Sequence, residues 1–516
     1  MKHWLDDSIF YEIYPQSFFD SNNDGIGDIP GITAKLDYIR DLGCNALWLN
    51  PCFLSPFGDA GYDVADYCLV APRYGTNADL EALFAAAHDR DMHVLLDLVP
   101  GHTSVEHAWF KESCKAAPNP YSGRYIWSRN VWDDVSRYEG IAGSLRGISE
   151  RDGCVAVNFF SMQPALNYGF AQVTAPWQSA VDSPEALATR QAMKDVMAFW
   201  LDKGCDGFRV DMAGSLVKND PGNEETIRLW QDMRAYLDES YPDAVLISEW
   251  GEPDKSLRGG FHMDFLLHFG PSHFMDLFRC DHPFFSREGK GTAYDFVKTY
   301  RKNYDLTNGK GLICIPSGNH DMQRLRKYLD PEEMKVAFAF LLSMPGAPFL
   351  YYGDEIGMRQ LDLVSKEGGY DRTGARTPMQ WGEGKNAGFS EAEAEALYLP
   401  QDPAADAPTA EAGQADPDSL WNEVRKLARL RHATPALQSR GGIEFVYCEP
   451  DKYPLAYLRT EGDQRVLVIL NPADRPTRFL CDHKLGQAIY QLGELPTQDR
   501  DVVTVPAASA AFFLVD

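Results

Sequence analysis

The sequence predicts an α/β fold, a (β/α)8 TIM barrel with an inserted domain and a C-terminal all-β sandwich domain. Short β-like runs that end in polar residues alternate with amphipathic helices along most of the chain, which is the pattern of a parallel sheet. Eight such units fit a closed barrel. Two stretches interrupt this rhythm, and 516 residues exceed one ordinary hydrophobic core, so we expect additional domains.

The predicted strands are short apolar runs, and seven of them are clear. An eighth, HMDFLLHF at 262–269, has an ambiguous period. The helices between the strands show one apolar stripe each, as in GITAKLDYIRDLG, and several end at a glycine. The seven clear strands are SIFYEIYP (8–15), CNALWLNP (44–51), HVLLDLVP (93–100), GFRVD (207–211), AVLISEW (244–250), GLICIPSGNHD (311–321) and APFLYYGDE (347–355).

The predicted barrel is built from two parts of the chain, 1–101 and 168–440. The segment 102–167 is rich in Trp, Tyr, Ser, Gly and Asn, and we interpret it as an insertion. From 441 to 516 the pattern changes to short alternating runs such as QRVLVILNP, which indicates a small all-β domain. The acidic stretch 390–418 offers little apolar surface, so we expect a helix in its first part followed by a solvated loop.

Composition limits the partners of the protein. A formal net charge of −26 argues against nucleic acid and anionic membranes, while a neutral sugar is compatible with it. No stretch approaches the ~20 apolar residues of a membrane span, and the start MKHWLDDSIF lacks the pattern of a signal peptide. The 10 cysteines form no CxxC pair, so we expect reduced thiols rather than a zinc site. We therefore expect a soluble, cytoplasmic protein of unassigned oligomeric state.

Polar side chains gather at the carboxyl ends of the predicted strands, where barrel enzymes hold their chemistry. Any one of them could be the partner in a structural ion pair. Together they predict a catalytic centre in which several carboxylates and two histidines converge. The third strand leads to Asp97 and His102, the fourth to Arg209 and Asp211, the fifth to Glu249 and the seventh to His320 and Asp321.

Two of these acids have the surroundings that glycoside cleavage requires, one carboxyl ionised and the other protonated. Arg209 precedes Asp211 by two residues, so both side chains point the same way and the guanidinium would hold the carboxylate ionised. Glu249 follows an apolar strand and precedes Trp250, which favours the protonated carboxyl of an acid catalyst. Asp321, supported by His320, would bind substrate hydroxyls more strongly as the sugar ring flattens.

Four motifs occur in order along the chain, DLVPGH, GFRVD, the glutamate of ISEW, and GNHD. On these motifs the chain resembles glycoside hydrolase family 13, the α-amylase family. The resemblance implies that Asp211 is the nucleophile, Glu249 the acid/base and Asp321 the transition-state stabiliser. It also implies that His102, Arg209 and His320 line the subsite for the cleaved glucose, and that 102–167 and 441–516 are the family's domains B and C. No organic cofactor is implied.

Within the family, the DGIGD loop and ARTPMQW (375–381) are similar to those of oligo-1,6-glucosidases, dextran glucosidases and trehalose synthases. In those enzymes an aspartate before the GYD tyrosine pairs with an arginine before TPMQW to bind the non-reducing glucose. The matching residues are Asp59 and Arg376, and an ordinary surface ion pair is the alternative. Tyr62 would stack on the sugar face, with a core tyrosine as the alternative.

The DSNNDGIGD segment has alternating oxygen-bearing side chains, which indicates a structural Ca²⁺ site, and an Asx-rich turn without metal is the alternative. A second calcium site of the family requires oxygen ligands where this chain has Gly101 and Ala165, so we expect that site to be absent. The candidate ligands are Asp20, Asn22, Asp24, the Ile26 carbonyl and Asp28.

These observations favour an exo-acting, retaining α-glucosidase that cleaves short gluco-oligosaccharides from the non-reducing end. The alternatives are a trehalose synthase-like isomerase or α-glucosyltransferase and, next, an endo-acting α-amylase. A non-catalytic binding protein is disfavoured because all three acids are present. After the nucleophile the chain reads DMAGSLVK, which matches neither the α-1,6-acting nor the amylase pattern, so the sequence leaves the linkage open.

Overall fold

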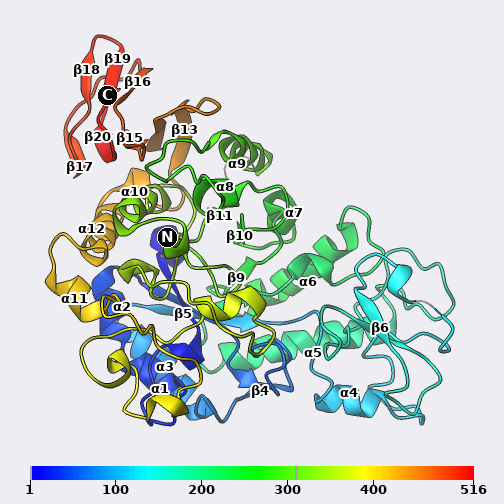
Figure 1. The fold of residues 1–516 in the computed structure, drawn as a ribbon. Helices are drawn as coiled ribbons and strands as arrows, with labels where there is room; N and C mark the ends of the chain where they lie inside the picture. Colours follow the sequence, from blue (N-terminus) through cyan, green and yellow to red (C-terminus); the bar gives the residue numbers. More distant parts are fainter. Residues whose placement is uncertain (1–2, 134, 308–311) are drawn as a thin grey trace.

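The structure is a computed structural model, and it describes residues 3–133, 135–307 and 312–516 (Figure 1). Within these residues, eight parallel strands form one sheet in the order β11-β10-β9-β8-β5-β2-β1-β12. An isolated parallel bridge from Pro316 to Phe349 connects the two end strands and closes the barrel. The fold-class prediction is therefore confirmed. The strands are β1 (Phe10–Ile13), β2 (Ala46–Leu49), β5 (His93–Leu98), β8 (Gly207–Val210), β9 (Val245–Ser248), β10 (Met263–Phe265), β11 (Leu312–Cys314) and β12 (Phe349–Tyr351).

The ambiguous eighth run is a strand, because β10 pairs in parallel with both β9 and β11. Aromatic rings fill the barrel below its carboxyl-end opening. Phe10 and Phe349 stack with ring centroids 4.3 Å apart, and Trp48 and Phe265 pack edge-on or tilted around them. This apolar layer forms the floor on which the polar side chains of the strand ends are held.

Helices surround the barrel, and their starts follow standard capping chemistry. Thr76 and Asp330 each begin a helix with a capping box, and Ser183 caps a helix that has Pro184 in its first turn. The helices outside the insertion are α1 (Ile29–Ala34), α2 (Leu36–Leu42), α3 (Asn77–His88), α5 (Pro184–Leu201), α6 (Glu224–Ser240), α7 (Pro253–Arg258), α8 (Phe274–Phe278), α9 (Tyr294–Leu306), α10 (Pro331–Leu341), α11 (Ala410–Ala415) and α12 (Leu420–Ala433). None of the described helices is both long and apolar enough to cross a bilayer.

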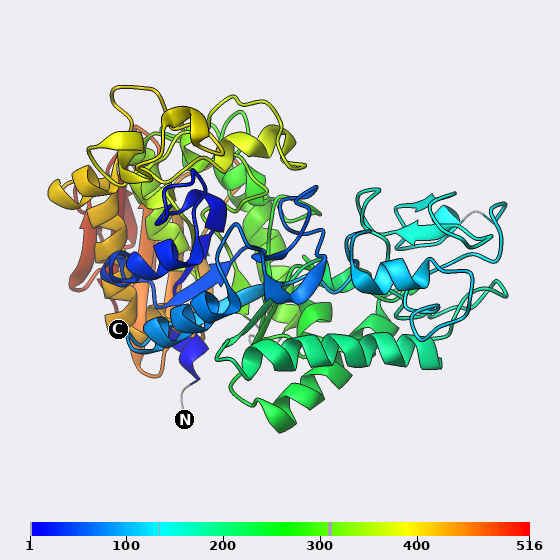
Figure 2. The same cartoon turned by 90° about the horizontal axis from the view of Figure 1, so that it is seen from below.

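The segment 102–167 and the C-terminal strands lie on opposite sides of the barrel in both views (Figures 1 and 2). The former contains α4 (Ala108–Ser113), the paired strands β6 (Gly143–Leu145) and β7 (Val155–Val157), and most of a small apolar cluster around Ile126 and Ile141. The latter form a five-stranded and a three-stranded antiparallel sheet with a separate core between them. The predicted domain boundaries themselves stay predictions. The C-terminal strands are β13 (Gly442–Tyr447), β14 (Leu455–Glu461), β15 (Gln464–Asn471), β16 (Thr477–Leu480), β17 (Ala488–Leu492), β18 (Thr497–Asp499), β19 (Val502–Val505) and β20 (Ser509–Leu514).

The prediction for the acidic stretch 390–418 is wrong. Its first part has only a single 3-10 turn, Ala394–Ala396, whereas the α-helix, α11, lies in the second part. Thr409 supplies the N-cap that α11 needs, since its side chain accepts a hydrogen bond from the Ala412 amide. The first part instead packs along the 20–28 loop, where the Tyr398 amide donates to the Gly25 carbonyl.

Strand β8 depends on a glycine at its first position. At Gly207 φ is +145°, and a Cβ there would lie 2.1 Å from the carbonyl oxygen of Val245 on β9. We expect Gly207→Ala to lower the free energy of unfolding by more than about 3 kcal/mol. The reason is that the backbone of β9, which is paired with β8, cannot move away from the added Cβ. Thermal unfolding measures the change.

The matched control is Gly147→Ala, where φ is +71° but no atom lies within 4 Å of the added Cβ. That variant carries only the left-handed backbone strain, about 1 to 2 kcal/mol. Equal losses in the two variants would contradict a steric requirement at the β8–β9 pair.

Candidate active site

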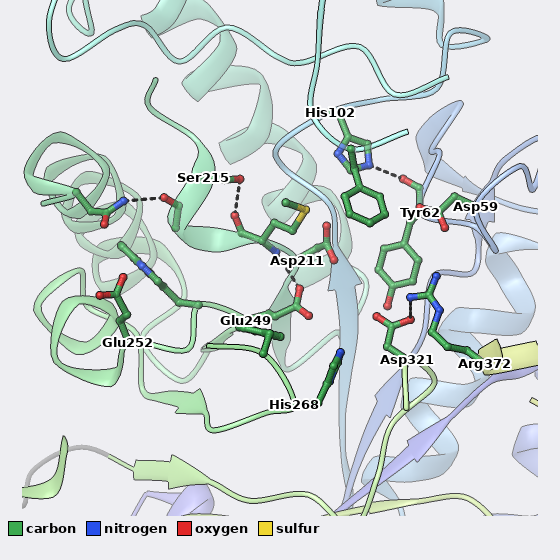
Figure 3. Close-up of a pocket in the computed structure, with 16 residues that line it drawn as sticks. Asp59, Tyr62, His102, Asp211, Ser215, Glu249, Glu252, His268, Asp321 and Arg372 are labelled. Atoms are coloured by element: carbon green, nitrogen blue, oxygen red, sulfur yellow. Dashed lines mark hydrogen bonds and ion pairs between the residues drawn. The ribbon is translucent and has the colours of Figure 1, made fainter. Parts of the chain in front are cut away.

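One pocket opens at the carboxyl ends of the barrel strands and encloses about 530 Å³ (Figure 3). The three predicted catalytic acids, Asp211, Glu249 and Asp321, all line it. They come from segments that follow β8, β9 and β11, so the convergence predicted from strand-end positions is present in the structure. The other lining residues are Asp59, Tyr62, His102, Phe159, Met212, Gly214, Ser215, Asn223, Trp250, Glu252, His268, Phe269 and Arg372.

Arg209 lies beneath the pocket floor and forms ion pairs with the acids around it. Its side chain is 1% exposed, and one of its nitrogens contacts Asp97 at 2.9 Å and Asp211 at 3.1 Å. Its other terminal nitrogen lies 2.9 Å from Oε2 of Glu249. The Met212 amide donates to the same Glu249 oxygen at 3.1 Å. The local environment of Glu249 is therefore charged and hydrogen-bonded, in contrast to the apolar environment that the sequence suggested.

Asp211 and Glu249 both contact this guanidinium. Burial, followed by the charge of Glu249, raises the pKa of Asp211, and Arg209 opposes the rise only in part. Arg209 thus favours the ionised form of Asp211 against the effect of burial. That Asp211 acts as an ionised nucleophile stays a prediction.

The expected pair between Asp59 and Arg376 is not formed. Arg376 donates to the His320 carbonyl at 2.8 Å and to Oδ1 of Asp321 at 3.1 Å. Oδ2 of Asp59 instead accepts a hydrogen bond from Gln163 at 2.7 Å, and burial raises the pKa of Asp59 to about 6. The reason is geometric. Gln163 extends from the 102–167 segment to Asp59, whereas Arg376 is buried behind the residues that line the pocket.

Arg372, which the sequence analysis did not single out, holds Asp321 from the pocket side at 2.6 Å. Although burial opposes ionisation, the charges of the neighbouring arginines lower the pKa of Asp321 below its usual range. Asp321 therefore remains a carboxylate acceptor. Arg372 lies four residues before Arg376, in the same DRTGAR run, so an excess of arginine beside ARTPMQW was the available signal.

Tyr62 and His102 line the pocket, whereas His320 lies behind it. The Tyr62 ring stacks on His320 with centroids 5.2 Å apart, and its hydroxyl bridges His320 and Asp97. Burial lowers the pKa of His102 to about 4, so this ring is neutral and contacts the Tyr62 carbonyl and Asn158. His320, Arg209 and Arg376 are buried and are not among the lining residues, so their predicted roles in glucose binding stay predictions.

The opposite end of the pocket consists of residues that sequence reasoning missed. Trp250 and Phe269 come from segments after β9 and β10. Glu252 also lines the pocket, where Figure 3 labels it, and Lys255 connects it, at 2.8 Å, to Asn223, at 3.0 Å. A mixed aromatic and polar surface of this kind suits a sugar, whose ring faces are apolar and whose edges carry hydroxyls. Position alone identifies these residues, because they form no sequence motif.

A buried lysine lies where the 102–167 segment meets the barrel, beside the Gly101 and Ala165 region. Lys218 is 1% exposed, and its ammonium donates to Oδ1 of Asn158 at 3.0 Å and to the Ser215 carbonyl at 2.6 Å. A Cβ at position 101 would lie 2.7 Å from the Asn158 amide nitrogen. The chain therefore places its own cation at this junction.

Side chains of the 20–28 loop accept hydrogen bonds from backbone amides of the same loop. Both oxygens of Asp20 accept from amides of residues 23–25 or from Ser390, and Asp28 caps α1 through the Gly31 amide. Asn22 and Asp24 accept from the amides two residues further on, as in Asx turns. Within the described parts of the chain, no group of three His, Cys, Asp or Glu side chains is arranged to hold a metal ion.

Comparison with known proteins identifies the family to which the chain belongs. The family model described as "Alpha amylase, catalytic domain" matches residues 12–440, which is most of the chain. The chain belongs to the α-amylase family. As a member of this family it is a glycoside hydrolase, and an oligosaccharide is its class of substrate.

Three relatives of this α-amylase family enzyme span most of its length. It is 32% identical to a glucan 1,6-alpha-glucosidase of Streptococcus pneumoniae over 95% of each chain. It is 31% identical to an oligo-1,6-glucosidase of Parageobacillus thermoglucosidasius over 97% of this chain and 95% of the relative. A trehalose synthase/amylase of Mycolicibacterium smegmatis is 34% identical over 77% of this chain and 70% of its own. The solved structure of the trehalulose synthase MutB from Pseudomonas mesoacidophila MX-45 superposes with a TM-score of 0.84 at 25% identity, with 100% of both chains covered.

The buried Lys218 of this α-amylase family enzyme should make the free energy of unfolding depend on pH. Burial lowers its pKa to about 7, whereas an unfolded lysine titrates near about 10.4. Between these values the unfolded chain binds more protons than the folded enzyme, so this lysine makes stability rise with pH from about 7 to about 10. We expect Lys218→Met to remove that rise, at most about 1.4 kcal/mol per pH unit.

Urea unfolding of both proteins across this pH range gives the difference between the two stability curves. Because methionine has a similar length and no charge, a constant loss at all pH values would reflect only missing hydrogen bonds. Parallel curves would contradict a neutral buried amine at high pH.

Proposed function

We propose that this enzyme is an exo-acting α-glucosidase that removes glucose from the non-reducing end of short gluco-oligosaccharides with retention of configuration. The observation that carries the proposal is the closure of the pocket at the end bounded by Asp59, Asp321 and Arg372. The Arg372–Asp321 pair and the Gln163–Asp59 hydrogen bond form two adjoining parts of this wall. A glucan chain has no straight path through it.

The loop 365–372 closes the wall from outside. A Cβ at Gly368 would lie 3.1 Å from Oδ1 of Asp59 and 3.3 Å from the Gly58 carbonyl, so the loop backbone rests against the terminal-glucose site. Glu367 anchors the loop through a 3.0 Å ion pair with Arg73. A longer chain would have to displace this loop and leave buried charges unpaired, which costs more than a terminal hydroxyl contact returns.

The acids support a double displacement. In the proposed first step, Asp211 attacks the anomeric carbon and Glu249 transfers its proton to the departing oxygen, which gives a glucosyl ester on Asp211. In the second step, Glu249 takes a proton from water, and the water oxygen displaces Asp211 with a second inversion. Arg209 contacts both acids, and Asp321 is poised as an ionised acceptor for ring hydroxyls.

The names of the relatives agree with this reading, since two are 1,6-glucosidases. A second candidate is an isomerase or glucosyltransferase, because other relatives are named trehalose synthases and the superposed structure is a trehalulose synthase. The aromatic end of the pocket, with Trp250 and Phe269, favours this candidate if it retains the released sugar. Chromatography of products from maltose, isomaltose, sucrose and trehalose separates the two, since only transfer or isomerisation yields new disaccharides.

We expect Asp211→Asn and Glu249→Gln each to lower turnover by several orders of magnitude with no change in melting temperature, because each removes a reacting group. Initial rates on p-nitrophenyl α-glucoside measure the loss. Thr226→Val, on the outer helix α6, is the control for substitution of a buried polar side chain.

The stereochemistry gives an independent check. Proton NMR during the first turnovers should show α-glucose before mutarotation. A β product appearing first, or near-native rates in either acid variant, would remove these catalytic roles.

The second prediction for function is release of single glucose units. With maltoheptaose or isomaltoheptaose, the first products should be glucose and the chain one unit shorter, and a heptaoside blocked at its non-reducing end should resist cleavage. Asp59→Ala should lower kcat/KM for these substrates roughly 10- to 100-fold, as expected for the loss of a buried charged contact. Mid-sized oligomers among the first products would support an open, endo-acting site.

We also propose a cytoplasmic location and calcium in the 20–28 loop. Every one of the ten cysteines, all of which lie in the described parts, is a free thiol, which suits a reducing compartment. The loop combines the hard oxygen donors of Asp20, Asn22, Asp24 and Asp28 with an exposed tip. The self-contained Asx turn described above is the alternative.

Calcium should raise the melting temperature of the enzyme in proportion to the logarithm of its excess over Kd, because only the folded loop presents the ligands. Asp24→Ala should abolish that rise while leaving glucosidase activity intact. A melting temperature and metal content that do not respond to chelation would favour the metal-free Asx turn.

A further inference from the structure

A buried acid and histidine lie behind the wall of the terminal-glucose site, and the double displacement does not use them. Glu12 on β1 and His320 after β11 are both 0% exposed. Oε1 of Glu12 lies 2.8 Å from Nδ1 of His320 and accepts the backbone amide of the same residue at 3.2 Å. No described group donates to Oε2 of Glu12. An anion with an unpaired buried oxygen is costly, so this carboxyl is better accommodated in its neutral form.

Counting protons along the contacts gives the direction of each hydrogen bond. The Tyr62 hydroxyl donates to Oδ2 of Asp97 at 2.8 Å, and Asp97 is held by Arg209 at 2.9 Å. The same hydroxyl oxygen lies 2.7 Å from Nε2 of His320. Because tyrosine has one hydroxyl proton, and Asp97 receives it, Nε2 has to be the donor to Tyr62. Nδ1 then carries no proton, and the Asn50 amide nitrogen lies 3.0 Å from it and 3.2 Å from Oε1 of Glu12. Because Oε1 of Glu12 lies 2.8 Å from Nδ1, two facing lone pairs would repel each other, so the proton between these two atoms belongs to Glu12.

We propose that Glu12 is a positioning residue that keeps its proton and donates it to Nδ1 of His320, which fixes this ring as the neutral Nε2–H tautomer. A directed row of hydrogen bonds then runs from Glu12 through His320 and Tyr62 to Asp97. The row holds the Tyr62 ring, which lines the glucose site, in one orientation above Arg209. Glu12 thus acts on substrate binding through a ring that it does not touch.

The charges around the pair favour the neutral form over an ion pair. Three guanidinium groups oppose a positive His320, and Asp321, at 3.5 Å from Nε2, already shares an oxygen with two of them. Burial favours the neutral form of both partners, since it raises the pKa of Glu12 and lowers the pKa of His320. The titratable and charged groups that face the pair are Tyr14, Tyr62, Arg209, Asp321, Arg372 and Arg376.

The protonation state can be read directly from the free enzyme by NMR with 15N-labelled histidine. The His320 signals are those missing from the His320→Gln variant. We expect the Nε2–H tautomer, unchanged from about pH 5.5 to about pH 8, where an ordinary histidine titrates. Imidazolium signals or the Nδ1–H tautomer would overturn the proposal, and this result does not depend on the substrate.

Two variants of similar side-chain length test the role in binding. The amide of Glu12→Gln can donate to Nδ1 as the protonated acid does, although its nitrogen cannot accept the His320 and Asn50 amides as Oε1 does. Glu12→Met can neither donate nor accept. We expect the Gln variant to keep kcat/KM on p-nitrophenyl α-glucoside within about threefold. We expect the Met variant to raise KM at least about tenfold, with a smaller change in kcat and a mixed His320 tautomer.

Glu355→Gln is the control for loss of a buried carboxyl, because Glu355 is 0% exposed and accepts from Tyr11 and Tyr38 away from the pocket. It should leave the His320 signals and KM unchanged. A Gln variant as impaired as the Met variant, or a Met variant with native KM, would overturn the proposal. The kinetic experiment rests on the proposed function, because it uses a glucoside as substrate. A wild-type enzyme that is inactive on this glucoside would count against the proposed function. The NMR experiment would still decide the role of Glu12.

Discussion

The candidate active site depends on the contact of one guanidinium with three carboxyl groups. Arg209 contacts Asp97, Asp211 and Glu249, all within 3.1 Å, and it is buried among them. Removal of this single positive charge would leave the carboxyl groups without a charged partner, which is costly at positions shielded from water. The aromatic floor and the glycine contact between β8 and β9 keep the atoms of this cluster in register.

The barrel and its acids could be predicted from the sequence because both follow from local rules. Parallel strands bring their carboxyl ends together, so Asp211, Glu249 and Asp321 had to converge once their strands were identified. The weak strand at 262–269 is fixed by pairing with its neighbours rather than by its own pattern. The helix near 390–418 was misplaced because composition does not reveal which residue will cap it, and Thr409 does so.

Contacts between distant segments could not be predicted from the sequence. Asp59 is bound by Gln163 rather than Arg376, because the path of the chain after β12 turns Arg376 toward Asp321 and places Arg372 at the surface of the pocket. His320 follows a strand end, as the acids do, but strand position alone does not say whether a side chain faces the cavity or the layer behind it. These are properties of loop conformation, which no periodicity records.

The segment 102–167 contributes little to the barrel core but provides partners for two residues that line the pocket. Asn158 binds His102, and Gln163 binds Asp59. The three candidate acids, by contrast, are all carried by the barrel. Replacement of this segment would therefore change the hydrogen-bond partners of Asp59 and His102 while the barrel still holds the acids, which gives engineered chimaeras a natural point of division.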